Sequence, residues 1–111
     1  PAAAAGVALQ LFARLLGDTC RSGDLVGRLG GEEFGVLLLH NSEPAGLALD
    51  RRLRRRLHAA SVAELGFALD YSAGMAVLQP GEAALAELMA RADGALYAAK
   101  TAGRGRLIAA D

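Results

Sequence analysis

Two adjacent carboxylates, Glu32 and Glu33, directly follow two glycines within residues 28–35. Carboxylate oxygens are hard ligands of the kind that Mg²⁺ uses when it carries nucleotide phosphates. The two glycines have no side chains, so a phosphate or a ribose could approach the backbone closely at this point. These residue types indicate a nucleotide and metal site or, alternatively, a solvated turn with two exposed acids.

The surrounding residues predict a β-hairpin that positions the two acids. β-Forming residues occupy segments 25–29 and 34–39, on either side of the Gly-Gly pair. Glycines accept the positive φ angles of a tight two-residue turn, which predicts that Gly30 and Gly31 form the turn. Adjacent side chains of a strand point to opposite faces, so we expect the two acids to have different roles.

The rest of the pattern predicts three helices and two further strands. The helices are predicted over residues 7–16, 45–60 and 82–101. The strands are predicted over residues 67–78 and 106–109. Gly103 follows the last helix as a C-terminal cap, and Tyr97 is expected in the core. This order of elements predicts an α+β fold with helices packed on a mixed sheet.

Length, composition and net charge limit the kinds of protein that this chain can be. The chain has 111 residues, enough for one domain, and 53% of them are hydrophobic. Its formal net charge is zero, which gives no reason to expect nucleic-acid or membrane binding by this segment. Cys20 is the single cysteine, so a cytoplasmic setting is expected, and Arg21 beside it could lower the pKa of the thiol.

Four motifs occur in an order that resembles the GGDEF domain family, the diguanylate cyclases. They are RxxD at residues 21–24, GGEEF at 30–34, SAG at 72–74, and ADGALYAAK at 92–100 with GRGR at 103–106. Gly105 replaces the Asn that is usual in the last motif. The resemblance covers the chain from about Val7 onward and implies a mainly antiparallel sheet related to the palm of polymerases and adenylyl cyclases.

The resemblance also implies roles for individual residues. Glu32 and Glu33 are the expected catalytic residues and ligands of Mg²⁺ or Mn²⁺, with Glu32 the first choice. The expected GTP-binding residues are Gly30, Gly31, Phe34, Lys100 and Arg104. The expected inhibitory site for the product, cyclic di-GMP, consists of Arg21, Asp24 and Arg52.

Simpler interpretations of the charged residues stay open. Lys100 and Arg104 could be cations that suit the dipole at a helix C-terminus. Arg21 and Asp24 could form an ion pair of little energetic worth on a surface turn. The arginines of residues 51–56 avoid the leucine stripe of their helix, which favours a solvated helix face.

The beginning of the chain departs from the family pattern. Family members open with a strand that carries an aspartate metal ligand, followed by a helix and a loop that reads guanine. Here residues 1–7 lead directly into the next helix, and Val7 stands where an aspartate is expected. We therefore expect residues 1–111 to be one N-terminally truncated domain without its first central strand, and inactive alone.

The implied activity is the condensation of two GTP molecules into cyclic di-GMP with release of pyrophosphate. Each domain of this kind presents one GTP, so the reaction implies a homodimer, usually driven by an upstream sensory domain. A membrane anchor upstream stays open. The alternative is a catalytically incomplete domain that senses cyclic di-GMP through Arg21 and Asp24.

Overall fold

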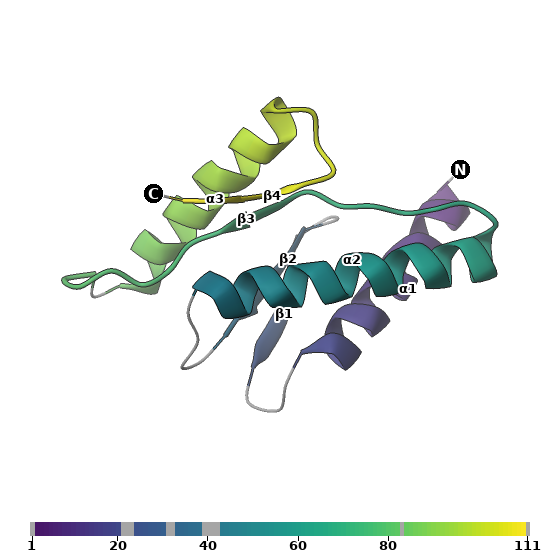
Figure 1. The fold of residues 1–111 in the computed structure, drawn as a ribbon, viewed down its shortest axis with the longest axis horizontal. Helices are drawn as coiled ribbons and strands as arrows, with labels where there is room; N and C mark the ends of the chain where they lie inside the picture. Colours follow the sequence, from purple (N-terminus) through teal and green to yellow (C-terminus); the bar gives the residue numbers. More distant parts are fainter. Residues whose placement is uncertain (1, 21–23, 31–32, 39–42, 83, 111) are drawn as a thin grey trace. The chain divides into compact units, whose positions relative to one another are not determined.

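A computed structural model describes residues 2–20, 24–30, 33–38, 43–82 and 84–110 (Figure 1). The elements follow in the order α1 (Ala2–Thr19), β1 (Leu25–Gly30), β2 (Glu33–Leu37), α2 (Glu43–Leu65), β3 (Ala73–Met75), α3 (Leu85–Thr101) and β4 (Leu107–Ala109). This order confirms the predicted α+β class. The chain divides into two compact units, Pro1–Leu69 and Asp70–Asp111. The assignment of residues 1–111 to one domain stays a prediction.

The core of the first unit lies between the helices α1 and α2. Leu11 and Leu16 from α1 and Leu53 and Leu57 from α2 are buried. Both helices are longer than predicted, because residues outside the apolar stripe continue the hydrogen-bonded turns. α2 ends at Leu65, directly before Gly66, whose φ of +83° suits glycine and whose N–H donates to the carbonyl of Val62 (3.1 Å).

The hairpin of the first unit is an antiparallel pair of β1 and β2. Arg28 pairs with Phe34 and Gly30 with Glu33, with an irregularity between Arg28 and Gly30. Gly30 therefore belongs to β1, which corrects the prediction that Gly30 and Gly31 form the turn. The irregularity shifts the register by one residue, so the two positions between the strands are Gly31 and Glu32, which lie outside the described residues.

An aromatic contact joins this hairpin to α1. The ring centroids of Phe12 and Phe34 are 5.2 Å apart, and the ring planes are tilted by 54°. A hairpin of two strands is marginally stable in water without a packing partner. The contact between Phe12 and Phe34 supplies part of that packing and ties the hairpin to the helix.

In the second unit, β3 and β4 pair in parallel and pack against α3 (Figure 1). Ala95 and Ala99 of α3 are buried. Gly74 of β3 lies so close to α3 that an added Cβ would overlap the carbonyl oxygen of Ala92 and the amide nitrogen of Leu96. Small residues on both sides therefore bring the strand and the helix backbone together.

The predicted strand over residues 67–78 is wrong in its extent, since only Ala73–Met75 is a strand. Two backbone N–H groups before it are taken by side chains: that of Leu69 donates to Ser61 Oγ (2.8 Å) and that of Tyr71 to Asp70 Oδ1 (2.8 Å). The partner β4 has only three residues. The described strands consequently form two sheets of two strands each.

The start of α3 also differs from the sequence prediction, which places the first residue of this helix at Glu82. Glu82 instead closes a turn: its N–H donates to the carbonyl of Gln79 (3.0 Å), and its carboxylate accepts from the Gln79 N–H (2.7 Å). Arg91 pairs with the same carboxylate at 3.0 Å. These bonds hold residues 79–82 outside the helix, which begins at Leu85.

The C-terminus of α3 agrees with the prediction of a glycine cap. The N–H of Arg104 donates to the carbonyl of Ala99 (2.9 Å) and that of Gly103 to the carbonyl of Lys100 (3.5 Å). Gly103 has a φ of +115°. These are the two bonds of a Schellman motif, which ends a helix in the left-handed conformation. Tyr97, however, is 74% exposed and is not a core residue.

Candidate functional site

Of the two adjacent carboxylates, Glu33 lies within the described residues, at the start of β2. Glu33 is the first residue of β2 and its side chain is exposed. Phe34 beside it is half-buried against Phe12, so its ring has a packing role, and its assignment to the nucleotide site stays a prediction. Glu32 and Gly31 lie outside the described residues, and their predicted roles remain predictions.

A metal site is not complete within the described part of the chain. Among those residues, no three His, Cys, Asp or Glu side chains gather closely enough to hold a metal ion. Glu33 is a carboxylate of suitable chemistry and is accessible from solvent.

Two members of the predicted product site lie near the C-terminal end of α1. Asp24 and Arg52 are both half-buried, and both interact electrostatically with Cys20, which directly follows the helix. Arg52 also donates from Nη2 to the carbonyl of Thr19 (3.5 Å). Asp24 and Arg52 therefore both lie near Cys20, whereas Arg21 lies outside the described residues.

The pKa of Cys20 is raised, not lowered as predicted. Burial is the largest cause, the negative charge of Asp24 adds to it, and the positive charge of Arg52 opposes it. Burial disfavours the charged thiolate, and this effect outweighs that of the cation. The thiol thus stays protonated below its ordinary pKa of 9.0.

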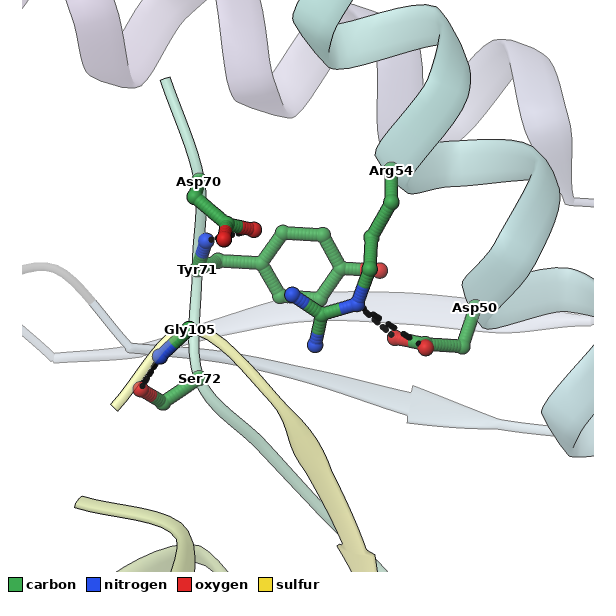
Figure 2. A network of polar contacts seen from close by, with 6 residues as sticks. All are labelled: Asp50, Arg54, Asp70, Tyr71, Ser72 and Gly105. Atoms are coloured by element: carbon green, nitrogen blue, oxygen red, sulfur yellow. Dashed lines mark hydrogen bonds and ion pairs between the residues drawn. The ribbon is translucent and has the colours of Figure 1, made fainter. Parts of the chain in front are cut away.

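The arginines of α2 are only partly the solvated face predicted from the sequence. Arg51, Arg55 and Arg56 are exposed, as expected. Arg54 is different: its side chain is 21% exposed and forms an ion pair with Asp50 at 2.9 Å, one helical turn earlier (Figure 2). Arg56 donates from Nη1 to Thr19 Oγ1 (3.2 Å).

In the second unit, the predicted phosphate-binding cations lie at the end of α3. Lys100 is half-buried in the last helical turn, where a cation suits the helix dipole. Arg104 is exposed and has a φ of 62°, a left-handed conformation that is uncommon outside glycine.

Gly105 explains why glycine can replace the family's usual Asn. Its φ is +61°, and asparagine is among the residues that tolerate this conformation better than most. Its N–H donates to Ser72 Oγ (3.0 Å), which fixes the loop after α3 to the residue before β3 (Figure 2). Glycine therefore preserves the backbone shape of the motif.

The comparison with protein families gives one match over nearly the whole chain. Residues 3–106 match the family described as "Diguanylate cyclase, GGDEF domain". The chain therefore belongs to the GGDEF domain family, which confirms the resemblance seen in the sequence. The chain is 42% identical over 101 residues to diguanylate cyclase DgcP of Pseudomonas aeruginosa. The aligned region covers 89% of this chain and 15% of DgcP.

Solved structures agree with this assignment. The active GGEEF domain of a diguanylate cyclase from Vibrio cholerae superposes with a TM-score of 0.86 at 28% identity, over 96% of this chain and 68% of that one. The GGDEF domain of DgcB from Caulobacter crescentus, solved in complex with c-di-GMP, gives a TM-score of 0.78 at 29% identity. The superposed region covers 92% of this chain and 62% of the DgcB chain. In the described ranges of the present chain, no helix is both long and apolar enough to cross a membrane.

Proposed function

We propose that the protein containing this chain is a diguanylate cyclase. The 3′-oxygen of each GTP attacks the α-phosphorus of the other, so that two phosphodiester bonds form and two pyrophosphates leave. The observation that carries the proposal is the GGEEF sequence at the hairpin of β1 and β2, with the Glu33 side chain exposed at the start of β2. Its place in a chain of the GGDEF family supports this reaction over a solvated turn.

We assign the residues of this reaction as follows. Glu32 and Glu33 would hold Mg²⁺ or Mn²⁺, and the bound metal would offset the charge of the triphosphate and so favour attack at phosphorus. Lys100 and Arg104 neutralise the phosphates of GTP. Gly30 and Gly31 allow the nucleotide to approach the backbone, and Phe34 holds the hairpin in place.

The reaction requires two GTP molecules, so we propose that two such domains face each other in a homodimer. The chain covers 15% of the length of DgcP, which leaves room in such proteins for an upstream sensory region that drives dimerisation. We place the reaction in the cytoplasm, where GTP is available.

The test of this activity is a product assay on the parent protein. Incubation with GTP and Mg²⁺ is expected to give one cyclic di-GMP for every two pyrophosphates, as measured by ion-exchange chromatography and a coupled phosphate assay. Chelation with EDTA should stop the reaction. Release of GDP and inorganic phosphate, or no consumption of GTP by a folded dimer, would contradict the proposal.

We also propose that Arg21, Asp24 and Arg52 form an inhibitory site for the product. An arginine binds phosphate through two parallel hydrogen bonds, and a carboxylate accepts from the edge of guanine. Support comes from the position of Asp24 and Arg52 beside the same residue, Cys20, and from the c-di-GMP complex of the similar DgcB domain.

Replacement of Arg21 with alanine is expected to relieve inhibition by added cyclic di-GMP and to leave the initial rate with GTP unchanged. The reason is that the site of inhibition is separate from the GGEEF hairpin in the sequence. Initial rates over a series of product concentrations measure the effect. An unchanged inhibition constant would remove this assignment.

The alternative function is a sensing module, and it is favoured by the same observation, the position of Asp24 and Arg52 near Cys20. A parent protein that binds cyclic di-GMP at this site but never consumes GTP would establish the module in place of the enzyme.

A further inference from the structure

A buried threonine at the end of α1 accepts hydrogen bonds from two arginine side chains of α2. Thr19 is 6% exposed, and its hydroxyl donates to the carbonyl of Leu15 (2.6 Å). The same oxygen accepts from Arg56 Nη1 (3.2 Å), while the Thr19 carbonyl accepts from Arg52 Nη2 (3.5 Å). One residue of α1 thereby orients two guanidinium groups.

The two arginines are placed to act on one ligand. They are four residues apart on α2, so they lie one above the other on the same face of the helix. Arg52 is also close enough to Cys20 to influence it, as is Asp24. A guanidinium has five N–H donors, and the bond to Thr19 uses the Nη1 nitrogen of Arg56, so within the described part of the chain other donors of this group could bind an anion.

We propose that Thr19 is a positioning residue for the product site, and that Arg56 supplies there, beside Arg52, a further guanidinium from α2 for the phosphates of a cyclic dinucleotide. This inference rests on the proposed product site and adds two residues to it. The bond from Thr19 Oγ1 to Arg56 holds this guanidinium on the side of α2 where Arg52 lies.

A purely structural role for the same contacts is the competing explanation. Cations near the C-terminus of a helix stabilise it through the helix dipole and through bonds to the last carbonyl groups. In that case, loss of Arg56 or of the Thr19 hydroxyl lowers the melting temperature and leaves ligand affinity unchanged. The two explanations therefore differ in whether the dissociation constant changes.

The experiment is isothermal titration of the parent protein, freed of nucleotide, with cyclic di-GMP. Arg56→Ala is expected to raise the dissociation constant about tenfold. Arg55→Ala is the matched control, because it removes the same charge from an exposed neighbour on α2 and should change the constant by less than about twofold. Thr19→Val should weaken binding by roughly threefold, and Thr19→Ser, which keeps the hydroxyl, should restore it.

The outcomes separate this inference from the proposal beneath it. If Arg21→Ala abolishes binding while Arg56→Ala and Thr19→Val bind like the unmodified protein, the roles of Thr19 and Arg56 are overturned and the product site stands. If Arg21→Ala also binds normally, the product site itself is wrong. Where Thr19→Val fails to fold, as checked by thermal melting, the comparison of Arg56→Ala with Arg55→Ala decides.

Discussion

Replacement of Gly74 with alanine is expected to lower the free energy of unfolding by roughly 3 kcal/mol, at the upper end of the usual cost of overpacking. A Cβ at this position would overlap the carbonyl oxygen of Ala92 and the amide nitrogen of Leu96, and would lie 2.8 Å from the Cα of Leu96. All three are backbone atoms of α3 and cannot rotate away. The methyl group would therefore force β3 away from the helix.

Chemical denaturation of the parent protein measures this effect, and Gly94 provides the matched control. Gly94 lies inside α3, and an added Cβ there would meet nothing within 4 Å. Gly94→Ala should raise the stability by about 1 kcal/mol, because alanine favours a helix over glycine. Equal unfolding midpoints for Gly74→Ala and Gly94→Ala would contradict the close packing of β3 on α3.

Replacement of Glu32 with alanine is expected to abolish formation of cyclic di-GMP by the parent protein. Removal of this carboxylate takes away the proposed first protein ligand of the metal, and loss of one group that stabilises a transition state costs about 100- to 1,000-fold in rate. The product assay with GTP and Mg²⁺ measures the loss. Binding of cyclic di-GMP should persist, because Arg21, Asp24 and Arg52 are unchanged.

A suitable control for this variant is Glu43→Ala. Glu43 is an exposed acid in the first turn of α2, outside the hairpin, so its loss removes the same charge without touching the proposed site. Turnover of the Glu43 variant should stay close to that of the unmodified protein. Full turnover by the Glu32 variant would refute the assignment of Glu32 to the metal.

Local signals in the sequence predicted the hairpin and the end of α3 well. The Gly-Gly-Glu-Glu segment between β-forming residues indicated two strands, and Gly103 indicated a helix end, because both depend on neighbouring residues alone. The order of the elements followed from the same kind of signal. The family motifs, which are also local, identified the class of protein.

Features that depend on distant partners were not predictable in this way. The alternation of residues 67–78 predicted a long strand, but strand length depends on the partner β4, which has three residues. Likewise, nothing in the arginine run of α2 indicates that Arg52 and Arg56 meet Thr19, because that residue lies on another helix. The raised pKa of Cys20 results mainly from burial of its thiol. The neighbouring Arg21 in the sequence gives no sign of that burial.

The left-handed backbone conformation of Arg104 lowers the stability of the fold, whereas the proposed function requires the arginine side chain at this position. A non-glycine residue in this conformation costs about 1–2 kcal/mol, and the residues on both sides of Arg104 are glycines. Glycine at 104 would therefore give a more stable fold and remove the proposed phosphate-binding cation. Selection of variants by thermal stability alone would favour the loss of this arginine, so any such search needs an activity screen beside it.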